Sequence, residues 1–124
     1  MSYIDWNLIH QCTDEERQKA TTLIKTLMTL KHHIEENGVK ALDDYIQNNA
    51  NQLQQKCAQY IIEGYMPELC KKLMYNILNS KERKPLEYLQ SVIFIEFLLI
   101  IQKNGLGDTE TRLFLLSFLG EENL

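Results

Sequence analysis

Apolar residues recur at helical spacing after the first dozen residues of the chain. The first such positions are Ala20, Leu23, Ile24, Leu27 and Ile34. Spacings of three and four residues place side chains on one face of an α-helix. Thr13 and Glu16 have the spacing of a capping box, which begins a helix, and Asn37-Gly38 supplies a left-handed stop. The pattern therefore predicts a helix over 14–36.

Further helices are predicted between breaks rich in asparagine, glycine and proline. They cover 39–47, about 52–63, 67–78, 85–103 and about 109–119. Asn48 to Asn51 form a polar break, and residues 79–84 form a charged linker between helices. Residues 1–12 are either an arm or a short helix. No segment alternates like a hairpin, so we predict an all-α fold, a compact bundle of five to six helices in a single domain over 1–124.

The helix predicted over 85–103 differs from the others because it is apolar on every side from Val92 to Ile101, except at Glu96. Such a helix is normally central in a bundle or half of a subunit interface. A carboxylate there is paired, protonated or placed at an edge. Glu96 therefore lies either on a partly exposed face beside a Lys, Arg or Tyr, or in a homodimer contact as a specificity device. Glu96 and Phe97 are the candidate oligomer contact.

Composition narrows the class of protein. The chain has 124 residues, of which 44% are hydrophobic, as expected of one folded domain. Its formal net charge of −4 makes nucleic-acid binding a poor expectation, because that binding depends on neutralising phosphates. The apolar stretch around Glu96 is about half as long as a membrane span requires. The N-terminal residues show no secretory signal, so we expect a cytoplasmic protein without membrane insertion.

Residues that could carry chemistry have simpler interpretations. Cys12, Cys57 and Cys70 form no CxxC pair, so core packing is expected rather than a metal site or disulfides. His32 and His33 are adjacent, and neighbouring helical residues point about 100° apart, which does not suit one metal ion. The sequence contains no glycine-rich phosphate loop and no nucleophile motif. We therefore predict no catalytic residue, no metal and no cofactor.

An acidic cluster flanks Gly38 and is the candidate partner-binding site. It comprises Glu35, Glu36, Asp43 and Asp44. Its two interpretations are a solvated rim and a contact surface for a basic protein partner.

Two pieces of the chain resemble the cytoplasmic segment between the second and third membrane spans of MotA-type flagellar stator proteins. The first is an apolar helix from Leu23, followed by Gly38 and the small-Leu-acid triplet Ala41-Leu42-Asp43. The second contains Ile61-Ile62, then Glu63-Gly64, then Pro67-Glu68 at the start of a helix. The resemblance covers about residues 23–77 and implies a helical module linked to flagellar or motor-like assemblies.

The sequence also departs from that family. The family has a basic residue three positions before the glycine, where it helps contact the rotor's switch protein, and this chain has Glu35 there. The family's acidic contact five positions after the glycine is matched by Asp43. The reversed charge at Glu35 opposes a rotor contact of the family's kind. The family's four membrane spans have no counterpart in this sequence, so the resemblance implies a module without the proton channel.

These observations predict a non-enzymatic, cytoplasmic protein–protein interaction module whose partner has a basic surface. One alternative is a structural homo-oligomer or adaptor, in which a homodimer forms through Glu96 and Phe97. The other is a small ligand-binding or enzymatic helical bundle, which would need a pocket with convergent polar groups.

Overall fold

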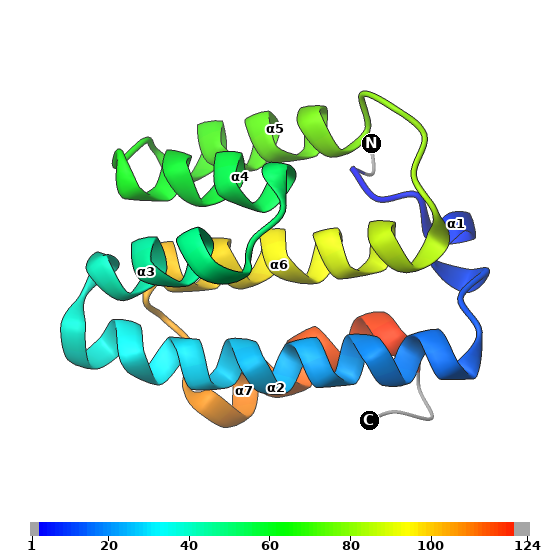
Figure 1. Ribbon diagram of the computed structural model, residues 1–124, viewed down its shortest axis with the longest axis horizontal. Coiled ribbons are helices and arrows are strands. Elements are labelled where there is room, and N and C mark those ends of the chain that lie inside the picture. Colours follow the sequence, from blue (N-terminus) through cyan, green and yellow to red (C-terminus); the bar gives the residue numbers. More distant parts are fainter. Residues whose placement is uncertain (1–2, 121–124) are drawn as a thin grey trace.

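A computed structural model describes residues 3–120, and within them it is all helical (Figure 1). The elements are α1 (Trp6–His10), α2 (Asp14–Asn37), α3 (Val39–Asn49), α4 (Gln52–Ile62), α5 (Pro67–Leu78), α6 (Pro85–Lys103), α7 (Asp108–Leu116) and a 3₁₀ turn (Ser117–Leu119). The all-α prediction is confirmed. The described part has one helix more than the upper predicted number, because Trp6–His10 is itself a helix, capped by the Asp5 side chain.

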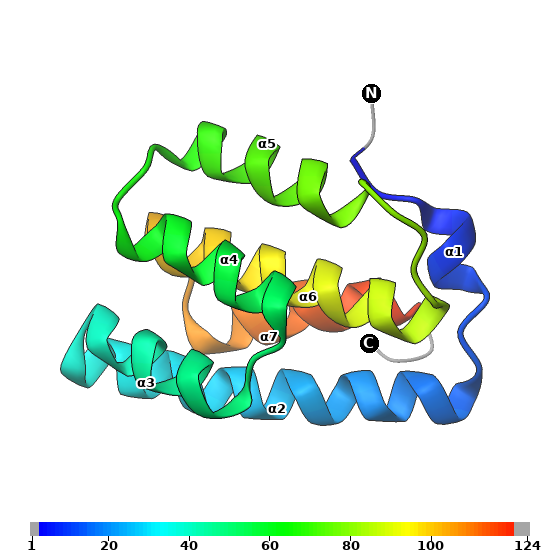
Figure 2. The ribbon, with the colours of Figure 1, turned by 45° about the horizontal axis from the view of Figure 1, so that its top comes forward.

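Helix α6 is the centre of the bundle. It packs against α1, α2, α4, α5 and α7, and it lies between α5 and α7 in both ribbon views (Figures 1 and 2). A helix that is apolar on all sides requires neighbours on all sides, and the chain folds five of its other helices around this one. The expectation of a central position in the bundle is confirmed.

The length and composition of α6 would also allow it to cross a membrane. Its most apolar 18-residue stretch has a mean hydropathy of 1.4, and more than half of that stretch is buried in the bundle. Core helices of soluble proteins share this length and apolar composition.

Local chemistry sets the ends of the long helices. The capping box at the start of α2 is present, because Thr13 and Glu16 bond each other's backbone N–H groups. Gly38 ends α2 with a φ of 75°, and Asn104 ends α6 in the left-handed region. The predicted polar break over Asn48 to Asn51 is shorter than expected, because α3 continues to Asn49 and the break falls on Ala50 and Asn51. The side chains of Asn48 and Asn49 bond carbonyls four residues back, so they follow the helix instead of redirecting the chain.

The charged linker is a fixed connection between α5 and α6. Arg83 donates from Nε to the Leu78 carbonyl at 2.8 Å and pairs with Glu87 at 3.1 Å. The N-terminal segment is held at the same end of the bundle. The Asp5 backbone N–H donates to the Tyr88 hydroxyl at 2.8 Å, so the described part of the N-terminal arm belongs to the packed structure.

All three cysteines are buried, as expected of core residues. Burial raises the pKa of the Cys57 thiol to about 12, so this side chain remains a protonated thiol at neutral pH. A protonated thiol is a weak nucleophile, which suits the packing role.

Candidate functional site

The residues of the predicted acidic cluster have different partners in the structure. Glu35 pairs with the Lys31 ammonium group at 3.1 Å, and the same ammonium group pairs with Asp108 at 2.7 Å. The Lys31 side chain is only 5% exposed, so its two carboxylate partners satisfy a buried charge. This ion-pair cluster joins the C-terminal half of α2 to the first residue of α7. Glu35 thus has a structural contact within the chain.

Of the other three acidic residues, Glu36 is exposed in the last turn of α2, and Asp43 and Asp44 lie on α3. Asp43 accepts a hydrogen bond from the Gln47 side chain at 3.3 Å, whereas Asp44 lines a groove between α2 and α3. Neighbouring helical positions point about 100° apart, so these two carboxylates diverge. Proximity in the sequence therefore does not give Glu35, Asp43 and Asp44 the same surroundings.

The Lys31 cluster predicts a pH dependence of stability. The Lys31 ammonium group lowers the pKa of Asp108 below its ordinary value of 3.8. A depressed carboxyl pKa contributes stability that is fully present above the unfolded value and is lost as the pH falls through the folded value. We expect Asp108→Asn to be less stable than the wild type at pH 7, with the difference narrowing below pH 3.8. Urea unfolding over a pH series measures this.

The matched control is Asp44→Asn, which removes an exposed carboxylate with no ion pair or hydrogen bond to its side chain in residues 3–120. Its free energy of unfolding should stay close to the wild-type value at pH 7. An Asp108→Asn difference that stays constant from pH 7 to the acid limit would contradict the role assigned to Lys31.

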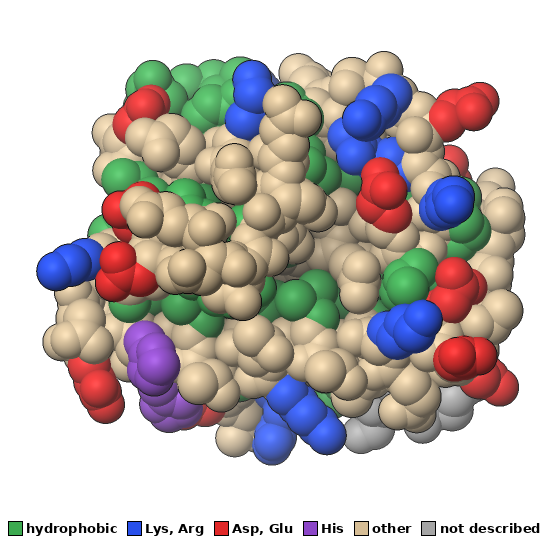
Figure 3. Space-filling view, in the orientation of Figure 1, with side chains coloured by type: hydrophobic (Ala, Val, Ile, Leu, Met, Phe, Trp, Pro, Cys, Tyr) green, Lys and Arg blue, Asp and Glu red, His purple; other side chains and the backbone are tan. Residues whose placement is uncertain are grey.

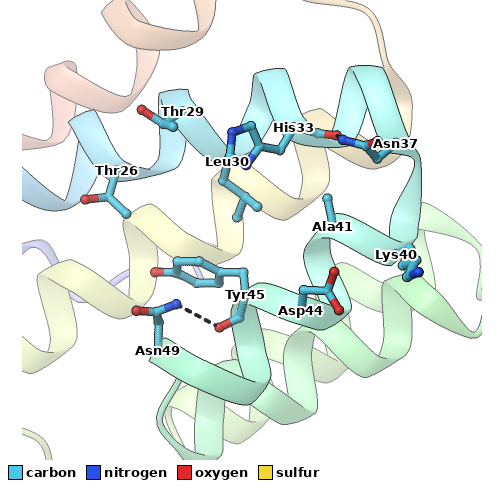
Figure 4. Close-up of a pocket in the computed structure, with 10 residues that line it drawn as sticks. All are labelled: Thr26, Thr29, Leu30, His33, Asn37, Lys40, Ala41, Asp44, Tyr45 and Asn49. Atoms are coloured by element: carbon cyan, nitrogen blue, oxygen red, sulfur yellow. Dashed lines mark hydrogen bonds between the residues drawn. The ribbon is translucent and has the colours of Figure 1, made fainter.

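A polar groove of about 720 Å³ lies between α2 and α3. Figure 4 shows its side chains projecting from the two helices around Leu30 and Ala41. Four of them make no side-chain hydrogen bond or ion pair within residues 3–120, namely His33, Lys40, Asp44 and Tyr45. The Tyr45 ring stacks on Phe94 at 6.3 Å between centroids. The groove offers separate polar contacts beside an aromatic ring, a combination that suits a small polar ligand.

A second, more apolar groove surrounds Glu96 and measures about 730 Å³. Helix α6 contributes Glu96, Leu99, Ile100 and Lys103, and further lining residues come from the start of α5, the 104–107 loop and α7. The Tyr75 hydroxyl donates to Glu96 Oε2 at 2.5 Å, and Tyr75 itself is only 1% exposed. Glu96 is half-buried, and within residues 3–120 no cation lies within ion-pair distance of it. The carboxylate is therefore held from one side and faces the groove with the other.

A third groove, of about 810 Å³, adjoins the second one. The two share Met66, Pro67, Ile100 and Leu106, and together we call them the apolar face. Five large apolar side chains on it are exposed: Val39, Tyr65, Met66, Leu106 and Phe114. Met66 is 71% exposed, the highest fraction among the exposed large apolar residues. In Figure 3, hydrophobic atoms gather at the upper left, where α5 begins.

The apolar face was not found from the sequence, and Phe97 was placed wrongly. Phe97 has no exposed surface and packs in the core of its own chain, so it has no area to offer a second copy. The predicted oligomer contact at Phe97 is corrected to a core position. Glu96 is half-buried beside Tyr75, which agrees with the prediction of a partly exposed face next to a Lys, Arg or Tyr.

Comparison of the chain with models of known protein families, with curated proteins and with solved structures finds no match. The resemblance to flagellar stator proteins therefore stays a prediction from the sequence.

Proposed function

We propose that this chain is a non-enzymatic, cytoplasmic helical module that binds a protein partner through the apolar face. The observation that carries the proposal is the gathering of exposed large apolar side chains beside two adjoining grooves. Contiguous exposed apolar surface costs free energy in water, and on soluble proteins it marks interaction sites.

The carboxylate of Glu96 adds a requirement for the partner. It borders an apolar groove and has one hydrogen-bond donor, Tyr75. A partner that covers the groove removes water from this carboxylate, so it must bring a cation or further donors. The predicted basic partner surface therefore has a more specific counterpart here, which is a cationic side chain set among apolar ones.

The acidic cluster supports partner binding less well. Glu35 is engaged with Lys31, and Asp43 and Asp44 point in diverging directions on α3. Exposed ion pairs in water contribute little to affinity, whereas burial of apolar area is the main favourable term in association. The proposal therefore moves the contact from the acidic cluster to the apolar face.

Site-specific photo-crosslinking in the native host tests the proposal. A photoreactive phenylalanine analogue at Leu106 should give protein adducts, because this exposed side chain belongs to both grooves. The same analogue at Thr22, an exposed position on α2 away from the face, is the matched control. If Leu106 and Met66 give no more adducts than Thr22, the apolar face is not a binding surface and the proposal is wrong.

A further inference from the structure

We infer that the partner on the apolar face is a second copy of this chain, in a two-fold dimer where Glu96 of each copy pairs with a lysine of the other. This inference rests on the proposed function, because it names the partner of the same face. In such a dimer, the cation that Glu96 requires is a lysine on the apolar face of the other copy.

The first argument is the charge of the groove around Glu96. Its charged lining residues are two acids, Glu68 and Glu96, and two bases, Lys71 and Lys103. Within residues 3–120, none of the four forms an ion pair with another residue. The Lys71 ammonium group instead lies 5.5 Å from the centre of the Tyr3 ring. The groove therefore carries no net charge on a chain whose formal net charge is −4.

Such a groove is complementary to itself. In a two-fold contact, any residue pair that forms between the copies forms twice. A contact between Glu96 and Lys71 or Lys103 of the other copy would therefore neutralise both carboxylates at once. A strongly basic partner would meet Lys71 and Lys103, and a strongly acidic one would meet Glu68 and Glu96. Each would face like charge, which disfavours binding.

The second argument is the extent and apolarity of the face. Eleven residues line one groove and fifteen line the other, with four in common. This is comparable to the roughly 20–30 residues that each side of a stable interface contributes. Five of the nine large apolar side chains exposed in residues 3–120 lie here. Homodimer interfaces are more apolar than transient ones, which suits this face.

Sedimentation equilibrium of the purified full chain tests the inference. We expect a monomer–dimer equilibrium between low micromolar and near-millimolar concentration. Lys71→Glu/Lys103→Glu makes the Glu96 groove wholly acidic, and it should raise the dissociation constant by about tenfold or more. Lys72→Glu is the matched control, because Lys72 is exposed on the same helix but does not line either groove. Circular dichroism establishes that each variant is folded.

A mixing experiment tests the pairing itself. Glu68→Lys makes the Glu96 groove basic. When mixed with Lys71→Glu/Lys103→Glu copies, it should form heterodimers, which native mass spectrometry separates by mass. Homodimers of Lys71→Glu/Lys103→Glu should be less abundant than these heterodimers.

The outcomes separate the dimer from the proposed function. A chain that is monomeric at every concentration, while Leu106 crosslinks a different protein in the host, overturns the dimer and leaves the proposed function standing. A monomer with no specific Leu106 adduct overturns both. A dimer that Lys72→Glu weakens as much as the double reversal does would place the contact elsewhere and overturn the inference.

Discussion

Replacing Phe97 with alanine is expected to lower the free energy of unfolding by about 3–5 kcal/mol. The Phe97 side chain is fully buried on the central helix, which has neighbouring helices on its different sides. Removing the ring loses its transfer free energy and leaves a cavity that the packed helices can close only in part. Urea denaturation followed by circular dichroism measures the change.

The control for this variant is Leu113→Ala on α7. Leu113 is 46% exposed and lines neither groove of the apolar face, so its loss should change the free energy of unfolding by about 0.5 kcal/mol or less. Both variants are compared at two protein concentrations. A Phe97→Ala effect that is small at high dilution and grows with concentration would return Phe97 to the oligomer contact and contradict its core position.

The sequence predicted the helices well where their ends are set by local chemistry. Helix α6 runs from Pro85 to Lys103 as predicted, because proline suits the first turn of a helix and Asn104 adopts the left-handed conformation that ends one. The start of α2 follows from the Thr13 capping box in the same way. The end of α3 is not set by such a signal, because Asn48 and Asn49 fit both a break and a last helical turn.

The same sequence pattern did not locate the functional surface. An apolar stripe around α6 fits both a core and an interface, and only the packing of five other helices decides between them. The ion pair of Lys31 could not be found from the sequence, because its partner Asp108 is 77 residues away along the chain. The apolar face combines helix ends and loops between Lys31 and Phe114. The sequence signal that could have indicated the apolar face is that Tyr65, Met66 and Leu106 are large apolar residues outside the periodic helical stripes.

Replacing Tyr75 with phenylalanine is expected to lower the free energy of unfolding by about 1.5–3 kcal/mol at neutral pH, the usual range for a hydrogen bond to a charged group. The Tyr75 hydroxyl donates to Glu96 at 2.5 Å from a ring that is 1% exposed. Without it, Glu96 keeps its place on the apolar helix but loses its donor. Urea denaturation of both proteins measures the difference.

The same variant has a predicted signature at alkaline pH. Burial, together with the Glu96 carboxylate, raises the pKa of Tyr75 above its ordinary value of 10.0. The unfolded chain therefore releases this proton first, so the stability from Tyr75 is fully present below pH 10 and is lost as the pH rises toward the folded pKa. The gap between wild type and Tyr75→Phe should narrow above pH 10.

Tyr45→Phe separates the hydrogen bond from the general effect of losing a phenol. The Tyr45 hydroxyl has no hydrogen-bond partner within residues 3–120, so its removal should cost little at neutral pH. If Tyr75→Phe costs no more than Tyr45→Phe, then Glu96 does not depend on Tyr75 for its position. The carboxylate would then be held by solvent alone, and the requirement for a cation from the covering partner would lose its structural basis, because a solvated Glu96 could turn away from the groove.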